Sequence, residues 1–198
     1  MLIRHLSRLS SAMGKRVMVI LAEGAEEMEA VISIDILRRG GCDVTVAGLS
    51  GPDPVTCSRG VFVKPDKPLK EAALNGPYDA VVLPGGLKGA KNLAESKEVG
   101  DLLKEHETRE SILAAICAGP IAFKSHGIGA GKSVTSHPSV KDEFSSGYKY
   151  SEDRVVQDGY LITSRGPGTA FEFALKLVEV LEGVDKKNEI IPPMLCKF

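Results

Sequence analysis

The sequence of 198 residues predicts an α/β sandwich, in which helices cover both faces of a mostly parallel β-sheet. Three features predict this class. Short runs of apolar, often β-branched residues recur along the chain, as in strands that are buried on both faces. Amphipathic stretches with helical periodicity alternate with these runs. Glycine and proline separate the two kinds of segment, and this alternation is typical of helices packed on a parallel sheet.

The first strand and the first helix have well-marked ends. Residues 16–22 (RVMVILA) form a largely apolar run that stops at Gly24, and they predict a buried strand. Residues 25–39 predict a helix, because acidic side chains occupy the first turn and arginines the last, as the helix dipole prefers. Gly40 and Gly41 follow and can end this helix.

The remaining elements follow from the same two patterns. Apolar or β-branched runs predict strands at residues 43–49, 61–63, 79–83, 112–116, 133–135, 154–156 and 160–163. Helical periodicity predicts helices at residues 69–74, 99–107, 120–125 and 169–182. The last of these helices has the most continuous apolar face, and Gly183 follows it as a stop signal.

The first fourteen residues differ in composition from the rest. Residues 1–14 (MLIRHLSRLSSAMG) carry Arg4 and Arg8 and several serines, and the first acidic residue of the chain is Glu23. On a helix the leucines and the arginines would occupy separate faces, which is typical of a mitochondrial presequence. A disordered leader without targeting function is the alternative. We therefore predict that the leader is followed by one domain over residues 15–198.

The overall composition excludes several classes of function. The formal net charge is −1 and aromatic residues make up 5%, so neither a basic surface nor a set of base-stacking rings favours specific nucleic-acid binding. Every apolar run is shorter than the roughly 18 residues of a membrane span. The four cysteines are widely spaced, which argues against a disulfide framework or a metal site and favours a reducing compartment. We predict a cytoplasmic protein that needs no metal or cofactor.

The most informative residue is Cys117. It stands between the predicted strand 112–116 and the predicted helix 120–125, on a turn that resembles a nucleophile elbow. Pro120 suits the first turn of that helix. Free N–H groups at a helix start favour the thiolate and can hold a developing oxyanion, so we predict a reactive cysteine with a lowered pKa. An inert cysteine packed as a small apolar residue is the alternative.

Three further positions can serve the same edge of the sheet. Glu29 lies beside the apolar stripe of its helix, where burial would raise its pKa and let it act as an acid–base group. A solvated glutamate is the alternative. His137 follows the strand at 133–135, although a lone histidine is as often structural. Gly85 and Gly86 follow the strand at 79–83, and this pair can offer a bare backbone N–H near Cys117 for an oxyanion. A phosphate-binding loop is the weaker interpretation, because the sequence here matches neither GxGxxG nor the P-loop pattern.

Several blocks resemble one known family. LAEGAEEME, DILRRGG, VTVAGL, CSR, YDAVVLPGG, AAICAGP, HP and ITSRGPGTAFEFAL resemble the Parkinsonism-associated deglycase (DJ-one) family, within the PfpI and class I glutamine-amidotransferase-like superfamily. The resemblance covers residues 15–182. It implies a flavodoxin-like three-layer sandwich that forms homodimers. The family's reactive cysteine falls on Cys117, its acidic partner on Glu29 and its nearby histidine on His137.

The resemblance also implies binding positions and an activity. Gly86 and Ala118 match the positions whose N–H groups face the cysteine, and Arg59 and Met28 match positions close to the dimer contact. Family members resemble one another in glutathione-independent glyoxalase activity, in deglycation of early methylglyoxal or glyoxal adducts, and in chaperone-like and redox-sensing behaviour. The compartments implied are the cytoplasm, the nucleus and, through residues 1–14, the mitochondrion.

Two departures from the superfamily limit the chemistry. Protease-like members place histidine directly after the nucleophile, whereas Ala118 follows Cys117 here. Amidotransferases use a His-x-Glu pair, whereas His137 is followed by Pro138 and Ser139 and has no acid to fix its tautomer. A family cysteine near the dimer contact is Lys64 here. We therefore expect a cysteine-dependent glyoxalase or deglycase without triad chemistry. A non-enzymatic redox sensor or chaperone that acts through oxidation of Cys117 is the alternative.

Overall fold

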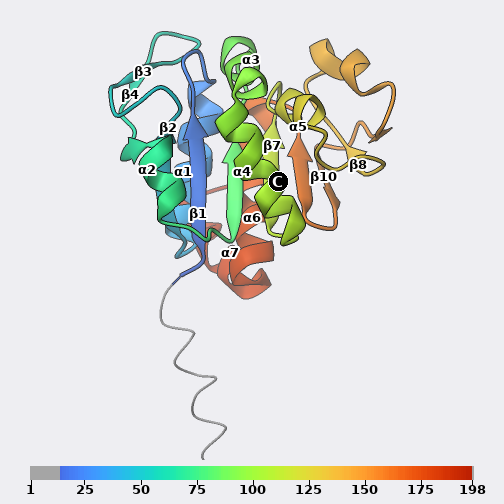
Figure 1. Ribbon diagram of the computed structural model, residues 1–198. Coiled ribbons are helices and arrows are strands. Elements are labelled where there is room, and N and C mark those ends of the chain that lie inside the picture. Colours follow the sequence, from blue (N-terminus) through green and yellow to red (C-terminus); the bar gives the residue numbers. More distant parts are fainter. Residues whose placement is uncertain (1–13, 198) are drawn as a thin grey trace, which may run out of the picture.

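A computed structural model describes residues 14–197 of the chain (Figure 1). The predicted presequence therefore lies, apart from Gly14, outside the described residues and stays a prediction. Among the described residues, every helix is too short or too polar to cross a membrane.

A seven-stranded sheet forms the centre of the fold, in the order β10-β11-β7-β6-β1-β2-β5. Neighbouring strands are parallel except β10, which runs antiparallel to β11. The strands are β1 (Arg16–Leu21), β2 (Asp43–Gly48), β5 (Lys67–Pro68), β6 (Ala80–Leu83), β7 (Ile112–Ile116), β10 (Val155–Asp158) and β11 (Leu161–Ser164). This arrangement confirms the predicted mostly parallel sheet.

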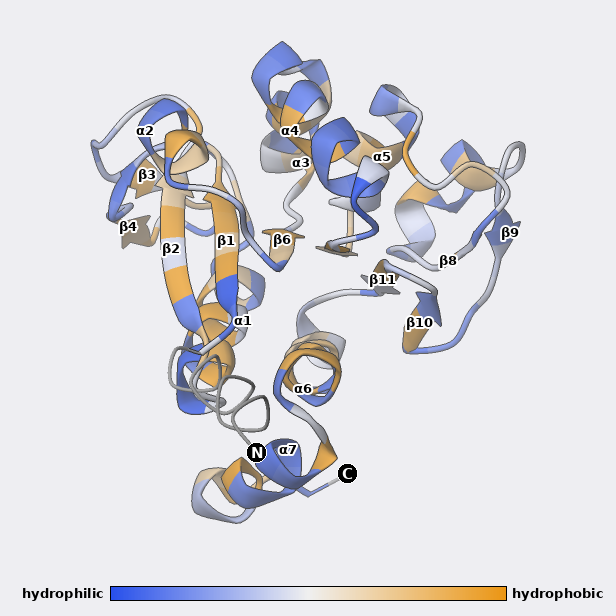
Figure 2. Ribbon diagram, turned by 60° about the horizontal axis from the view of Figure 1, so that its bottom comes forward, coloured by the Kyte–Doolittle hydropathy of each residue, from blue (hydrophilic) through white to orange (hydrophobic). Residues whose placement is uncertain are grey.

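Helices cover both faces of the sheet, as Figure 2 shows from one end. One layer contains α1 (Glu27–Arg39), α6 (Ala170–Glu182) and α7 (Val184–Ile190), and the other contains α2 (Leu69–Leu74), α3 (Leu87–Glu95), α4 (Lys97–Thr108) and α5 (Pro120–His126). In β1, Val17 and Val19 belong to the core under the first layer, whereas Met18 and Ile20 belong to the core under the second. Because successive strand side chains point to opposite faces, the continuous apolar run is the pattern that a doubly covered strand requires.

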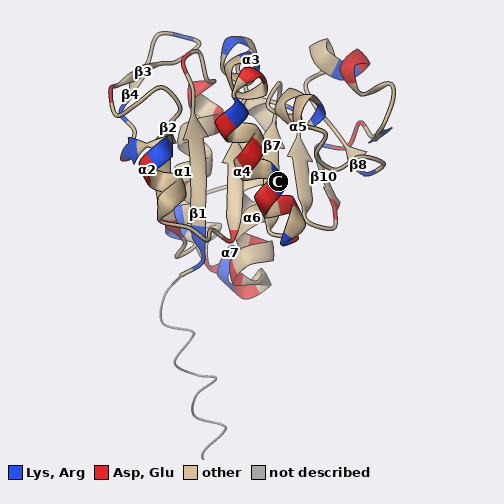
Figure 3. Ribbon diagram, viewed as in Figure 1, with Lys and Arg blue, Asp and Glu red and all other residues tan. Residues whose placement is uncertain are grey.

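Charged residues fall mainly on the helices and the loops, while the strands carry few of them (Figure 3). The three-layer α/β sandwich predicted by the sequence is therefore confirmed. It has the flavodoxin-like form that the resemblance implied.

Some segments differ from their predicted roles. The strand predicted at 61–63 is β4 (Phe62–Val63), which pairs with β3 (Val55–Thr56) in a separate hairpin outside the central sheet. The strand predicted at 133–135 is β8 (Ser133–Val134), which pairs with β9 (Lys149–Tyr150) in another small sheet. A 3-10 segment, η2 (Pro138–Phe144), connects β8 to β9, and two shorter ones are η3 (Pro167–Thr169) and η4 (Pro192–Met194).

The sequence patterns do not predict α3, α7 or β5. Helix α3 (LKGAKNLAE) contains a glycine, which lowers helix propensity. Helix α7 is short and largely polar, so it shows little periodicity. Strand β5 has two residues, one of them proline, which suits its place at the edge of the sheet.

Candidate active site

The turn after β7 holds Cys117 in an uncommon backbone conformation. Its φ is +64°, in the left-handed region that non-glycine residues rarely adopt. The turn is fixed on both sides, because the Cys117 N–H donates to the Ser164 carbonyl at 3.0 Å and its own carbonyl accepts from the His137 N–H at 2.9 Å. Helix α5 starts at Pro120 directly afterwards. The predicted strand–turn–helix placement is confirmed, and the strain is of the kind found at functional sites.

The carboxyl group of Glu29 is completely buried beneath this turn, with an exposed fraction of 0%. It lies in the first turn of α1, where its backbone N–H donates to the Glu26 carboxylate at 2.8 Å. Its Oε2 accepts from the Gly85 N–H at 2.7 Å, and its Oε1 has no hydrogen-bond partner among the described residues. The carboxyl also interacts with the thiol of Cys117. Of the two interpretations from sequence, the structure therefore supports the buried acid.

Burial raises the pKa of Glu29 to about 7. Desolvation penalises the charged carboxylate, and the hydrogen bond from Gly85 only partly offsets that cost. A carboxyl with this pKa can both give and take a proton near neutral pH, as a general acid–base catalyst must.

The predicted lowering of the thiol pKa is wrong for the resting site. Burial and the neighbouring charge of Glu29 raise the pKa of Cys117 to about 12. The N–H groups of Gly86 and Ala118 act in the predicted direction and lower it, but they do not compensate for the burial and the acid. Two adjacent negative charges cannot both be accommodated in a buried site, so the thiol and the carboxyl titrate as a coupled pair that holds one proton near neutral pH.

The two glycines after β6 have different roles. Of the predicted pair, Gly85 does not supply the bare N–H near Cys117, because its N–H is already bonded to Glu29. A side chain at Gly85 would place its Cβ 2.6 Å from both the Cys117 Cβ and the Glu29 Oε2, so only glycine fits between them. The Gly86 N–H faces the sulfur as predicted, together with that of Ala118.

His137 is half-buried at the start of η2, where Ser139 fixes its ring. The Ser139 N–H donates to Nδ1 at 3.2 Å, and the Ser139 Oγ lies 2.8 Å from the same nitrogen. A backbone N–H can only donate, so Nδ1 is an acceptor and the neutral ring carries its proton on Nε2. The expectation that no group fixes the tautomer is therefore wrong. The hydrogen bond from the Ser139 backbone N–H fixes the tautomer in place of an acidic side chain.

Arg59 lies at the rim of the site, on the loop between β3 and β4. Its N–H donates to the Glu27 carboxylate at 2.8 Å, and the neighbouring Ser58 hydroxyl donates to the same group at 2.9 Å. Glu27 thus ties this loop to the start of α1. The guanidinium of Arg59 is exposed, so it can reach a ligand without forming part of the buried centre.

These residues surround one cavity of about 470 Å³ at the carboxyl end of the sheet. Its lining includes Cys117, Ala118, Gly86, His137, Ser139, Arg59 and Met28. Cys42 and Cys57 are buried elsewhere, and burial raises their pKa to about 12 and about 11. The sequence analysis does not identify Glu26 or Ser139 as site residues. Glu26 could have been found as a capping residue three positions before Glu29, and Ser139 as a hydroxyl-bearing residue two positions after His137.

At the end of β7 a cysteine in the left-handed backbone conformation lies beside a buried carboxyl. This arrangement is typical of α/β sandwich proteins whose reactive residue stands on a nucleophile elbow. The chain belongs to the DJ-1/PfpI family, which it matches over residues 15–180, as the resemblance predicted. It is 56% identical to the Parkinson disease protein 7 homolog of Danio rerio over 93% of this chain and 98% of that one. It is 46% identical to the glutathione-independent glyoxalase DJR-1.2 of Caenorhabditis elegans over 87% of this chain and 91% of that one.

A solved structure supports the same assignment. The crystal structure of Drosophila melanogaster DJ-1beta matches with a TM-score of 0.92 and 51% identity. The match covers 94% of this chain and all of that chain. The family therefore includes a named glyoxalase, which supports an enzymatic activity at the level of the family.

Proposed function

We propose that the chain is a glutathione-independent glyoxalase that converts methylglyoxal to lactate, and that it acts on early methylglyoxal adducts as a deglycase. One observation carries the proposal: a carboxyl with an exposed fraction of 0% and a pKa near 7 contacts the only thiol that lines the described cavity. The name of the Caenorhabditis elegans relative supports the same reaction.

The first step joins the sulfur of Cys117 to the aldehyde carbon. Above pH 7 the Glu29 carboxylate is ionised and takes the thiol proton as the sulfur attacks, so no free thiolate has to be maintained beforehand. The product is a hemithioacetal. The N–H groups of Gly86 and Ala118 point to the sulfur and can hold the oxygen anion that forms beside it.

The second step moves a proton between the two carbons of the substrate. The proton on Glu29 passes to the hemithioacetal oxygen, with the Nε2–H of His137 as a further donor at the cavity wall. The regenerated carboxylate then removes the C1 proton to form an enediolate and returns that proton to C2, while the hydroxyl proton on the C1 oxygen passes to the C2 oxygen. Carbon 1 is thereby oxidised and carbon 2 reduced, so no external oxidant is needed. Water hydrolyses the resulting thioester, releases lactate and restores the thiol.

The test is production of lactate from methylglyoxal in the absence of glutathione. We expect Cys117→Ser to lower kcat by more than about a hundredfold, because the nucleophile is lost. Cys196→Ser, at another partly exposed cysteine, is the control and should retain activity. Turnover should rise with pH through about 7, as Glu29 becomes ionised. Lactate production by Cys117→Ser at the wild-type rate would contradict the proposal.

A redox sensor is the second candidate function, because Cys117 is partly exposed and lines the cavity while Cys42 and Cys57 are buried. Two molecules of peroxide would oxidise the thiol through a sulfenic acid to a sulfinate, with release of two waters, and the sulfinate oxygens could accept hydrogen bonds from the protonated Glu29 carboxyl and from the two N–H groups. Negligible lactate production together with fast peroxide oxidation at Cys117, measured by mass spectrometry, would favour this role over the glyoxalase.

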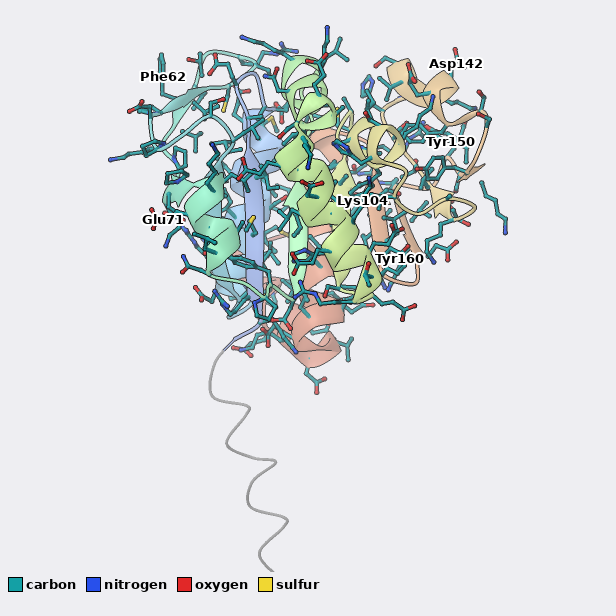
Figure 4. The ribbon with its side chains drawn as sticks, viewed as in Figure 1. Phe62, Glu71, Lys104, Asp142, Tyr150 and Tyr160 are labelled. Atoms are coloured by element: carbon teal, nitrogen blue, oxygen red, sulfur yellow. The ribbon has the colours of Figure 1, made fainter. Side chains whose placement is uncertain are left out.

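We also propose that the chain forms a homodimer, as the family resemblance implied. Met28 and Val31 on α1 are exposed to 52% and 47%, and Phe62 on the β3–β4 hairpin to 71%. Phe62 points away from the body of the protein (Figure 4). A monomer mass in sedimentation equilibrium at micromolar concentration would contradict this proposal.

A further inference from the structure

A second cavity of about 550 Å³ lies next to the active-site cavity, between α3, α5 and η2. We call it the α3–α5 groove. Its apolar lining consists of Leu87 and Ala94 from α3 and Ile121 from α5, and its rim carries two lysines and two glutamates. No step of the proposed mechanism uses it.

The groove and the cavity that contains Cys117 share one wall residue, Leu87. Leu87 is exposed to 69%, so its side chain is accessible to a ligand from either cavity. Ile121 is in the first turn of α5, four residues after Cys117. The turn that holds the nucleophile therefore also sets one wall of the groove.

The size of the two adjacent cavities indicates a substrate larger than the free aldehyde. Methylglyoxal is only a few times the size of a water molecule, which occupies about 30 Å³ in the liquid. The active-site cavity alone measures about 470 Å³. Cavities of this size are typical of ligands with many more atoms, and a three-carbon group would leave the whole groove empty.

The charges at the rim indicate what kind of molecule extends into the groove. Lys124 pairs with Glu143 at 2.8 Å, and Lys91 lies 3.8 Å from Glu95. Both lysines are thus matched by an acid, and the rim has no excess positive charge to attract a phosphate. An apolar floor between balanced ion pairs favours an aliphatic side chain over a nucleotide.

We propose that the α3–α5 groove binds an apolar side chain of a polypeptide that carries a three-carbon adduct in the Cys117 cavity. The identity of the adduct rests on the proposed function, whereas the groove itself does not. Peptide-borne adducts with an aliphatic neighbour are then the preferred substrates, and Leu87, Ala94 and Ile121 determine that preference.

The probe is a set of acetylated peptides with one carboxyethyl-lysine, a stable product of methylglyoxal. One leucine is moved through the two positions on either side of the modified lysine, with serine at the others, and an all-serine peptide is the reference. Dissociation constants are measured by calorimetry, which needs no turnover. We expect the best leucine peptide to bind about tenfold more tightly than the reference, a difference of about 1.4 kcal/mol.

Ala94→Gln is the blocking variant, because a longer side chain at this half-buried position fills the groove. We expect this variant to bind the leucine and serine peptides about equally tightly and to leave turnover of free methylglyoxal unchanged. The matched control is Ala73→Gln on α2, at another half-buried alanine that packs against the same core and lines a different cavity. This control should keep the tenfold preference.

The outcomes separate the two proposals. Equal binding of leucine and serine peptides by the wild type, or an unchanged preference in Ala94→Gln, overturns the groove proposal. Tighter binding of carboxyethyl-guanosine monophosphate than of any peptide, lost in Ala94→Gln, overturns it in favour of a nucleotide. Lactate production by Cys117→Ser would reject the proposed function alone, since the peptide affinities do not depend on catalysis.

Discussion

The two ends of the central sheet both carry a cavity, and they differ in how their polar groups are paired. At the amino end, Lys15, Arg16 and Asp79 help to line about 710 Å³, a larger space than the 470 Å³ around Cys117. Asp79 accepts the Arg16 N–H at 2.8 Å and pairs with Lys15 at 3.3 Å, with both side chains well exposed. At the carboxyl end, Glu29 is fully buried and one of its oxygens has no partner within residues 14–197.

The difference shows that size alone does not identify a reactive site. The amino-end charges are solvated and paired, so they contribute little beyond ordinary surface ion pairs. At the carboxyl end, a desolvated acid, a strained cysteine and unshared N–H groups converge. Such an arrangement is costly for stability, and it is the kind of cost that functional sites retain.

The largest expected effect is on kcat, and it is tested by replacing one acidic residue at each end of the sheet. Glu29→Gln keeps the shape of the side chain but cannot take a proton, so we expect kcat for methylglyoxal to fall about a hundredfold to ten-thousandfold. Asp79→Asn is the matched change at the amino end and should leave kcat within about twofold. Steady-state lactate assays at pH 8 measure both. Comparable losses in the two variants would show that the ends do not differ in this way.

The sequence predicted the architecture of both ends well, because buried parallel strands leave a strong local signal. The run at residues 112–116 and the helix start at Pro120 were enough to place Cys117 on a turn. The sequence left the burial of Glu29 as one of two alternatives, because this burial depends on a contact with Gly85, which is more than fifty residues away in the chain. Local sequence patterns do not predict such a long-range contact.

The electrostatic prediction failed for the same reason. The helix start favours a thiolate, and the N–H groups of Gly86 and Ala118 do lower the pKa of Cys117. Burial and the charge of Glu29 have larger effects in the opposite direction, and both arise from tertiary packing. The tautomer of His137 was likewise hidden, because it depends on the geometry of η2 and not on an acidic side chain.

The second prediction concerns stability and pH. Burial raises the pKa of Glu29 from 4.5 in the unfolded chain to about 7 in the folded protein. Below pH 4.5 both states hold the proton, and between pH 4.5 and 7 the unfolded state loses it first. The folded state is therefore progressively destabilised as the pH rises, by up to about 3 kcal/mol at pH 8.

Glu29→Gln cannot ionise and should escape this loss. Urea unfolding at pH 5 and pH 8 measures the difference, and we expect the variant to gain stability relative to the wild type by up to about 3 kcal/mol between these values. Asp79→Asn, at the solvated end, should show no comparable gain. A constant difference between Glu29→Gln and the wild type across this range would mean that the carboxyl is not desolvated in solution.

The smallest expected effect concerns Ser139, which holds the His137 ring through Nδ1. Ser139→Ala removes the hydroxyl at 2.8 Å and keeps the backbone N–H, so we expect kcat to fall about threefold to tenfold, as for one hydrogen bond of about 1 kcal/mol. Ser139→Thr retains a hydroxyl and should restore most of the activity, and Ser111→Ala in the amino-end cavity is the control. Nitrogen-15 NMR of the imidazole gives an independent readout, since the Nδ1 shift should change in Ser139→Ala alone. An unchanged shift together with an unchanged kcat would show that the backbone N–H is sufficient to orient the ring.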